Sequence, residues 1–305
     1  MVYAFGESLL DVIIHDLDHV VARPGGSMLN ASMSLSRAGV DVSLITELGN
    51  DPTSKLMIDF LQKHRIHTEY ITRYPDNKTA VALAFLDDHK KPTYTFLKDY
   101  PVNRTINFPS RFMSRDLFLF GSLYALDKDI QNYLQAGKKA AREAGALILY
   151  DPNIRQKEKL NSEGMKELVF EHIRAAHLVK GSDEDFEALF GTTDTNEIFE
   201  KLVRINPETL FVMTRGREGA SAMRNGHVIH APAQPVEVVS TIGAGDGFNA
   251  GMAAFLSGNP KPVSEWDDVY VEALLEKGIR FASSVCASDE NYIQTSFGSA
   301  FSELK

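Results

Sequence analysis

Residues 116–153 contain the pattern that decides the fold. They begin with the apolar run DLFLFGS (116–122), continue through the helical stretch IQNYLQAGKKAAREAG (130–145) and end with ALILYDPN (146–153). Two buried strands joined by a helix predict a βαβ unit, in which the crossover helix makes the strands parallel. Asp151 follows the second strand, at the edge where open α/β sheets bind their ligands.

The same alternation continues on both sides of this unit. The predicted strands are VYAF (2–5), DVSLITELG (41–49), HLVKGS (177–182) and TLFVMTRG (209–216). The predicted helices are SMLNASMSLSRAG (27–39) and TSKLMIDFLQKH (53–64), and the chain beyond Gly243 is mostly helical. We expect Ser27 to cap the first helix and Gly39 to end it. An Asn-Gly pair within 220–231 signals a hairpin.

Alternating βα units predict an α/β fold of three layers, with a central, mostly parallel sheet covered by helices on both faces. The sequence shows no internal repeat and no low-complexity linker, so we expect residues 1–305 to form one domain. Segments 11–23 and 79–98 break the rhythm, because their apolar residues alternate as in an antiparallel sheet with one exposed face. We expect these two insertions to form a small β lid.

Charge and cysteine content restrict the class of protein. The chain of 305 residues carries a formal charge of −9 and no block of basic residues, so neither nucleic acid nor an anionic membrane is an expected partner. A single cysteine, Cys286, fits a reducing compartment. The first residues lack the basic and apolar regions of a signal peptide, and we expect a cytoplasmic protein.

The stretch STIGAGDGFNAG (240–251) carries the chemistry. Its glycines lie where a helix begins, and the first N–H groups of a helix have no partner within it. With the helix dipole, such a start suits an anion such as phosphate. The stretch does not match the P-loop pattern. Asp246 among these donors fits a base that accepts a hydroxyl proton during phosphoryl transfer; the alternative is tight packing with Asp246 as a partner of the helix dipole.

Two further glycine-containing stretches follow strands. In RPGGSMLN (23–30), Gly25 and Gly26 allow close approach, and Asn30 lies one turn into the predicted helix. An amide there, together with Asp11, suits adjacent sugar hydroxyls, although the stretch taken alone favours an ordinary capped helix. The other stretch, TRGREGA (214–220), predicts only a hairpin turn when taken alone.

Taken together and in order, these pieces resemble the ribokinase/fructokinase family, the PfkB-type carbohydrate kinases. The resemblance covers nearly all of the chain and is nearest to the fructokinase branch. The segments that carry it are FGESLLD (5–11), PGGSMLNASMSLSRAG (24–39), ELGND (47–51), YDPNIR (150–155), VMTRGREGA (212–220) and STIGAGDGFNAG (240–251). It implies a single ribokinase-like catalytic domain that transfers the γ-phosphoryl group of ATP to a sugar hydroxyl, with Mg²⁺ neutralising the charge of ATP.

The resemblance also implies roles for individual residues. Asp246 is the expected catalytic base, and the backbone N–H groups of Gly243, Ala244 and Gly245 are the expected anion hole. The residues expected to bind the sugar are Asp11, Gly25, Gly26, Asn30 and Arg155. The residues expected to bind the nucleotide are Ser182, Thr214, Gly216 and Gly219.

Three positions depart from the family pattern. Ser240 stands where many members have an acid that helps to bind a monovalent cation, so we expect weak dependence on K⁺. The family's N-x-x-E motif, which supports the metal and phosphates, corresponds to Ser182 and Asp185 here; Asp185 is expected to act on the metal through water, and Glu184 is an alternative to it. The segment FASSVCASDENY (281–292) is more polar than usual near the adenine, so its base contacts are not assigned.

Several substrates remain open at this stage. FGESLLD, PGGSMLN and DPNIR favour D-fructose, and 2-keto-3-deoxygluconate is the second candidate, with other sugars or nucleosides behind it. A different class is a sugar- or nucleotide-sensing protein that has lost catalysis on the same fold. The exposed face of the lid makes a homodimer the expected assembly.

Overall fold

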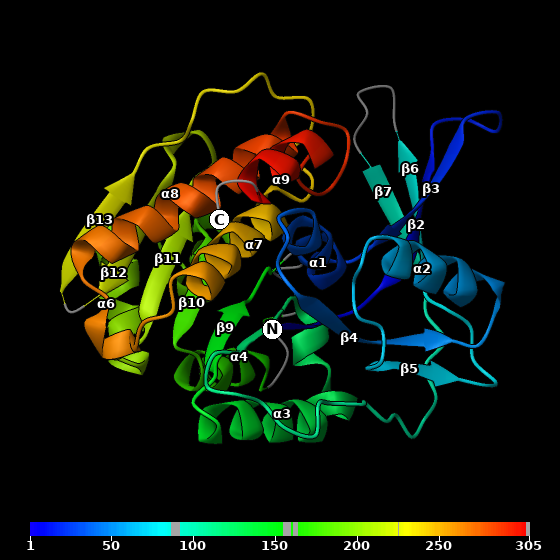
Figure 1. Ribbon diagram of the computed structural model, residues 1–305, viewed down its shortest axis with the longest axis horizontal. Helices are drawn as coiled ribbons and strands as arrows, with labels where there is room; N and C mark the ends of the chain where they lie inside the picture. The colour runs from blue at the N-terminus through cyan, green and yellow to red at the C-terminus, as the bar shows by residue number, and fades with distance from the viewer. Residues whose placement is uncertain (87–91, 155–159, 161–163, 225, 303–305) are drawn as a thin grey trace.

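A nine-stranded sheet forms the centre of the computed structural model, which describes residues 1–86, 92–154, 160, 164–224 and 226–302 (Figure 1). Its strand order is β13-β12-β11-β10-β9-β8-β1-β4-β5, and all neighbours are parallel except at β11-β12-β13. The strands of this sheet are β1 (Val2–Phe5), β4 (Val42–Gly49), β5 (Ile71–Tyr74), β8 (Leu117–Gly121), β9 (Leu147–Asp151), β10 (Leu178–Ser182), β11 (Leu210–Thr214), β12 (Ala220–Arg224) and β13 (His227–Ala231).

Helices cover both faces of the sheet and give the three predicted layers. On one face of the sheet, the helices that contribute to the hydrophobic core are α1 (Ser27–Arg37), α2 (Pro52–Lys63), α7 (Ala244–Gly258), α8 (Asp268–Cys286) and α9 (Thr295–Ser302). Those that pack with the other core are α3 (Gln131–Glu143), α4 (Met165–Ala175), α5 (Asp183–Phe190) and α6 (Thr195–Ile205). Short 3-10 helices are η1 (Leu123–Leu126), η2 (Lys128–Ile130), η4 (Gly216–Glu218) and η5 (Val263–Glu265).

Strand β8 shows why the sheet is buried on both sides. Successive side chains of a strand point to opposite faces. Accordingly, Leu117 and Leu119 belong to the core of α1 and α7, whereas Phe118 and Phe120 belong to the core of α3 and α4. A continuous apolar run is therefore what a two-sided parallel strand requires, and the prediction of a βαβ unit over 116–153 is confirmed by the parallel pairing of β8 with β9.

The lid is a separate four-stranded sheet, seen at the upper right of Figure 1. Its order is β3-β2-β6-β7, with strands β2 (Leu9–Ile14), β3 (Val20–Gly25), β6 (Val81–Leu86) and β7 (Pro92–Leu97). Each hairpin is antiparallel, but β2 and β6 pair in parallel, so the purely antiparallel sheet expected from the sequence is corrected to a mixed one. Residues 87–91, where the sequence predicts a turn between β6 and β7, lie outside the described residues.

A buried ion pair holds the chain where it leaves the lid after β7. Arg104 Nε donates to Glu47 Oε1 at 3.1 Å, and Asp127 accepts from the same guanidinium. The hydroxyl groups of Tyr74 and Tyr124 also donate to Glu47. Because both charges are almost fully buried and are satisfied by several partners, this network anchors the segment after β7 to the end of β4.

Two details of the fold differ from what the sequence predicts. Ser27 does not cap α1, because Gly26 is the N-cap and no side chain caps the helix. Strand β5 (Ile71–Tyr74), which the sequence analysis did not predict, adds a further parallel strand beside β4. No helix in the described residues combines the length and the apolar character needed to cross a membrane.

Candidate active site

The first turn of α7 leaves backbone donors available. Gly243, the N-cap, has φ +81°, and a Cβ on it would lie 2.2 Å from the carbonyl oxygen of Asn291. Only glycine fits both conditions. Among the described residues, the N–H groups of Gly243, Gly245 and Asp246 have no hydrogen-bond partner, whereas Ala244 N–H donates to Thr241 O at 3.2 Å. The helix start therefore has the free donors and the dipole that an anion needs.

Asp246 is held at this helix start by the beginning of α1. Its carboxylate is buried, with Oδ1 accepting from Ser27 Oγ at 2.5 Å and Oδ2 accepting from Asn30 Nδ2 at 2.9 Å. A carboxylate has about four lone-pair sites, so acceptor capacity remains for a substrate hydroxyl. The structure thus brings together two stretches that lie far apart in the sequence.

Asn30 faces the same space with a second polar atom. Its Oδ1 is buried and has no partner in the described part of the chain. A buried polar atom of this kind normally has a hydrogen-bond donor. A hydroxyl of a bound sugar would supply one.

Asp11 lies on β2 beside Gly25, the last residue of β3. A Cβ on Gly25 would lie 1.9 Å from Asp11 Oδ2, so the glycine gives the carboxylate its room. Gly26, with φ +119°, turns the chain from β3 into α1 and so places Asn30. The lid and α1 therefore meet at the expected sugar set, except for Arg155, which lies outside the described residues.

Sequence reasoning missed several residues of this cluster. Asn153 Nδ2 donates to Ser27 Oγ at 2.7 Å, which links the end of β9 to the Asp246 group. Asn153 has φ +40°, an uncommon value outside glycine that asparagine tolerates best. The sequence signal for a role of Asn153 is its place in the DPN stretch (151–153), at the end of a buried strand.

A second buried group lies near Asp246. Lys180 on β10 donates to Asp151 Oδ2 at 3.0 Å, and Asn249 of α7 donates to the same oxygen at 2.6 Å. Burial opposes the charge of the Lys180 ammonium, but the nearby carboxylates of Asp151, Asp185 and Asp246 outweigh it and raise its pKa. Lys180 is therefore a fixed positive charge inside the protein.

Ser182 and Asp185 form a capping box at the start of α5. Asp185 Oδ2 accepts from Ser182 N and Oγ, both at 2.8 Å, and Asp185 Oδ1 accepts from Ile154 N at 2.6 Å. With these bonds the carboxylate is largely occupied, which leaves room for a water-mediated rather than a direct metal contact. No cluster of three or more His, Cys, Asp or Glu side chains suited to a metal occurs within the described ranges.

The expected nucleotide-binding turn follows β11. Thr214 ends the strand, Gly216 begins η4 with φ +49°, and Gly219 has φ +94° before β12. The carboxyl ends of β10 and β11 are adjacent, with Ser182 paired to Thr214, so the expected nucleotide residues share one edge of the sheet. Ser240 Oγ accepts from Ile242 N at 3.2 Å and thus stabilises the turn before α7.

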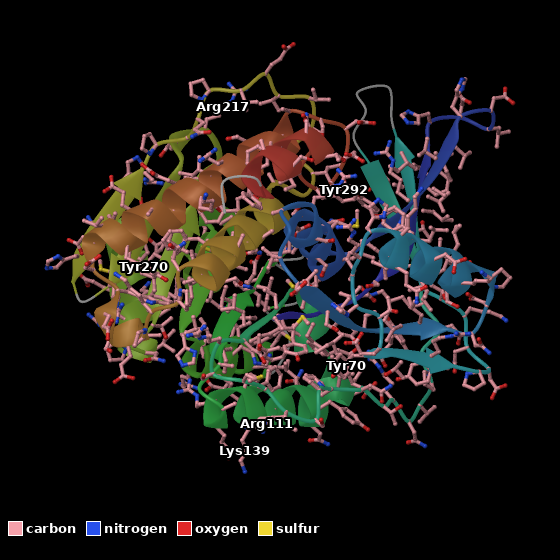
Figure 2. The ribbon with its side chains drawn as sticks, in the orientation of Figure 1. Tyr70, Arg111, Lys139, Arg217, Tyr270 and Tyr292 are labelled. Atoms are coloured by element: carbon pink, nitrogen blue, oxygen red, sulfur yellow. The ribbon has the colours of Figure 1, made fainter. Side chains whose placement is uncertain are left out.

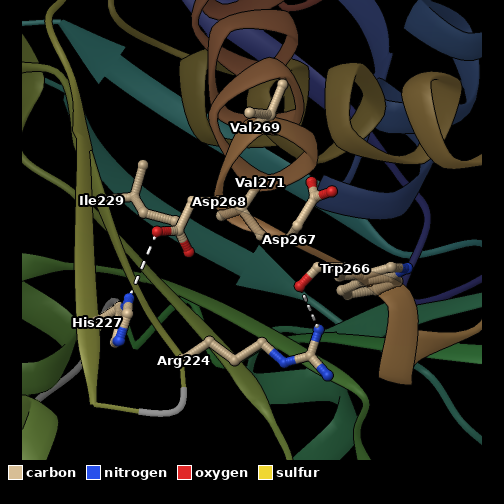
Figure 3. A pocket seen from close by; sticks show the side chains of 8 residues that line it. All are labelled: Arg224, His227, Ile229, Trp266, Asp267, Asp268, Val269 and Val271. Atoms are coloured by element: carbon tan, nitrogen blue, oxygen red, sulfur yellow. Dashed lines mark hydrogen bonds and ion pairs between the residues drawn. The ribbon is translucent and has the colours of Figure 1, made fainter.

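A hollow of about 460 Å³ lies elsewhere, between β12, β13 and the start of α8 (Figure 3). Its polar groups pair with one another: Arg224 donates to Trp266 O at 3.2 Å, and His227 Nδ1 lies 3.4 Å from Asp268 Oδ2. Trp266 stacks on Tyr270 and is buried, as expected for a residue that packs at a helix start. The residues that line this hollow include none of the Asp246 cluster.

Comparison with known proteins finds similar sequences among characterised kinases. A fructokinase of Klebsiella pneumoniae is 26% identical over 267 residues, covering 86% of each chain. An aminoimidazole riboside kinase of Salmonella typhimurium is 26% identical over 259 residues, covering 84% of this chain and 81% of the relative.

Solved structures agree on the fold. The fructokinase of Vibrio cholerae O395 with fructose, ADP and calcium ion has a TM-score of 0.82 at 22% identity and covers 98% of both chains. The aminoimidazole riboside kinase of Salmonella enterica with aminoimidazole riboside and an ATP analogue gives the same TM-score, identity and coverage. These neighbours show a ribokinase-like fold. The family model for pfkB family carbohydrate kinases matches residues 1–288, and the chain therefore belongs to this family of sugar kinases.

Proposed function

We propose that the protein transfers the γ-phosphoryl group of ATP to a hydroxyl of D-fructose. The observation that carries this proposal is the buried Asp246 carboxylate, held by Ser27 and Asn30 beside free N–H donors at the start of α7. A base and an anion site at one helix start are the two elements that phosphoryl transfer to a hydroxyl needs.

In the proposed reaction, Asp246 accepts the proton of the attacking hydroxyl while the hydroxyl oxygen forms a bond to the γ-phosphorus. The bond to the ADP oxygen breaks, and the N–H groups of Gly243, Ala244 and Gly245 hold the transferred group. Because Ala244 N–H is already bonded to Thr241, Gly243 and Gly245 carry the larger share. These fixed donors stabilise the charge that develops in the transition state.

We place the sugar between the lid and α1, and the nucleotide at the ends of β10 and β11. Asp11, Gly25, Gly26, Asn30 and Arg155 are the proposed sugar set, with Thr214, Gly216, Gly219 and Ser182 for the nucleotide. Mg²⁺ would neutralise ATP, and Asp185 fits a water-mediated contact to it because its oxygens already accept three bonds. The lid and the large sheet would act as a single catalytic unit over residues 1–305.

Fructose is the first candidate because the fructokinase-like segments of the sequence surround the Asp246 cluster. The similarity of an aminoimidazole riboside kinase in both sequence and fold makes that nucleoside a second substrate to test. 2-Keto-3-deoxygluconate remains the other sugar candidate, since it is also compatible with the DPNIR segment (151–155).

A coupled assay of ADP release tests the proposal. Fructose, ribose, 2-keto-3-deoxygluconate, aminoimidazole riboside and fructose 6-phosphate are compared at equal concentrations, each with K⁺ or with a bulky organic cation. Fructose should give the highest kcat/KM, and K⁺ should have little effect, because Ser240 provides no charged oxygen to the cation. ATP binding without turnover on any substrate would instead support a sensor.

We also propose a homodimer through the outer face of the lid. In the register of β2 and β6, Val12 pairs with Leu83 and Ile14 with Phe85, so their side chains share one face. Phe85 is 45% exposed and Val20, opposite Ile14, is 50% exposed. Light scattering should give twice the mass of 33.9 kDa, and Phe85→Asp should shift it to the monomer.

A further inference from the structure

Lys180 lies in an unusual environment for a lysine. Lys180 is the third residue of β10 and is only 4% exposed. Its Nζ donates to Asp151 Oδ2 at 3.0 Å. Lysine is rarely buried unless it is paired, and an ammonium has three donors. Within the described ranges Asp151 is the only hydrogen-bond acceptor for it, so two donors lack a protein partner.

The position of the ammonium relates it to the helix start. A Cβ on Gly245 would lie 3.0 Å from Lys180 Nζ, which is the nearest atom met there. Cα–Cβ bonds of a helix tilt toward its N-terminus. Since Gly245 is the second residue of α7, the ammonium lies beside the first turn, where Gly243, Gly245 and Asp246 have N–H groups without a partner in the described protein.

Two neighbours fix this position. Asp151 accepts from Lys180 and also from Asn249, which lies one turn further along α7 at 1% exposure. These bonds tie β9, β10 and α7 together behind the anion hole. The neighbouring carboxylates raise the pKa of Lys180, so the lysine stays charged in spite of its burial.

We propose that Lys180 is a further catalytic residue, whose ammonium donates a hydrogen bond to an oxygen of the phosphoryl group in transfer. This inference rests on the proposed function, in which the start of α7 binds that group. The covalent change is unaltered: the new P–O bond forms, the bond to ADP breaks and the proton goes to Asp246. Lys180 keeps its proton, and its hydrogen bond strengthens as charge develops on the phosphoryl oxygens.

The competing explanation is that Lys180 only neutralises Asp151. A set of variants separates the two: Lys180→Met, Asp151→Asn, and the double variant that carries both changes. The double variant removes both the ammonium of Lys180 and the carboxylate of Asp151, so no unpaired buried charge remains. The amide oxygen introduced by Asp151→Asn can still accept the hydrogen bond from Asn249. If Lys180 touches the phosphoryl group, kcat of the double variant stays about 10²–10³-fold below wild type, as when one anion-hole donor is lost.

Lys138→Met is the matched control. Lys138 is equally buried at 3% exposure, but it contacts His172 between α3 and α4, on the opposite side of the sheet from α7. This variant should keep the wild-type kcat whatever its stability. Melting curves of all variants show which are folded at the assay temperature, and the double variant provides a folded test if Lys180→Met is unstable.

Binding of ADP with aluminium fluoride, a mimic of the group in transfer, provides the second readout. Lys180→Met and the double variant should bind ADP alone within a few-fold of wild type but lose about 10²-fold for ADP with aluminium fluoride. If the wild-type enzyme is active, a double variant with wild-type kcat and wild-type affinity for that mimic would overturn the role of Lys180. A wild type without turnover on any substrate would overturn the proposed function itself.

Discussion

At the scale of single residues, the Asp246 cluster has one polar atom whose partner is missing from the described protein. Asn30 donates through Nδ2 to Asp246, and its Oδ1 is buried without a donor. Leaving such an atom unpaired costs about 1–3 kcal/mol. A sugar hydroxyl that donates to Oδ1 would recover this free energy, so Asn30 is suited both to orient Asp246 and to bind the substrate.

Asn30→Ala should lower kcat/KM for the sugar by about 10–100-fold, which corresponds to the loss of one buried hydrogen-bond set. Affinity for ATP, measured by calorimetry, should change little, because Asn30 lies on α1 and the proposed nucleotide residues lie at the end of β10 and in the turn after β11. Ser32→Ala is the control, since Ser32 is buried in the same helix and, among the described residues, donates only to Met28 O. A loss that falls on ATP instead would mean that the two ligands are placed the wrong way round.

The sequence indicates only some of these residues, for a physical reason. Gly243 and Asp246 belong to one short motif, so the chemistry of a helix start is visible locally. Ser27 resembles a cap in the sequence, yet its hydroxyl donates to a carboxylate 219 positions away. Asn153 and Lys180 depend on which strands lie side by side. Such contacts follow from the sheet order and not from local spacing.

At the scale of elements, the side chain of Arg23 and residue Asp289 form a contact between the lid and the rest of the molecule, called here the latch. Arg23 of β3 donates to Asp289 O at 2.7 Å and to Asp289 Oδ2 at 3.0 Å. Asp289 lies in the loop after α8, where Arg37 also packs over Tyr292, labelled in Figure 2, at 4.4 Å from the ring centroid. The same loop supplies Asn291 O beside Gly243, so the lid, α1 and the start of α7 meet there.

Arg23→Ala should weaken lid closure and raise ATP hydrolysis relative to sugar phosphorylation, because an open lid admits water. The ion pair is partly exposed and contributes about 1 kcal/mol or less, so the change should be no more than about fivefold. His19→Ala, between β2 and β3, is the control, since within the described part of the chain its side chain pairs only with Asp16. An unchanged ratio in Arg23→Ala would show that the latch does not govern closure.

Hydrogen exchange tests closure independently of any variant. Backbone amides of 79–86 and 92–98 should gain protection when the sugar is added, because a closed lid covers them. Residues 147–151 of β9, buried in the large sheet, serve as the internal reference. Equal protection of the lid strands with and without sugar would make the lid a fixed wall.

Among the elements, the sequence predicts the βα alternation and the two inserted hairpins well. It does not predict that β2 and β6 lie side by side in parallel, because neither strand is connected to the other by a short turn or by a crossover helix. The short β5 strand is also missed, since ITRY (71–74) alternates in burial too briefly to give a pattern.

At the scale of the whole molecule, two histidines are neutral in the folded protein: His172, which is buried, and His177, which is partly buried. His172 is fully buried between Lys138 and Ala125 O, and burial lowers its pKa to about 3. Burial likewise lowers the pKa of His177 to about 4. In the unfolded chain both would titrate near about 6.5, so between that pH and their folded values the unfolded state binds more protons.

The free energy of unfolding should therefore fall as the pH drops below about 6.5. For His172 alone the loss between about pH 7 and about pH 5 is about 2 kcal/mol. Urea unfolding across this pH range measures it. His172→Gln keeps a donor and an acceptor and should flatten the pH dependence, whereas His67→Gln, at a half-exposed side chain, should not. An unchanged slope in His172→Gln would show that the pKa of His172 does not differ between the folded and unfolded states.

Asp246→Asn tests most directly whether this carboxylate is the base of a sugar kinase. The amide has the same size and leaves the N–H donors of α7 in place, so ADP and ATP should bind within a few-fold of wild type. Loss of a general base lowers the rate by about 10²–10⁴-fold. Single-turnover phosphorylation of the best sugar, followed in wild type and Asp246→Asn at saturating ATP, should show a loss of this size. A variant that transfers phosphoryl at the wild-type rate would contradict the assignment of Asp246.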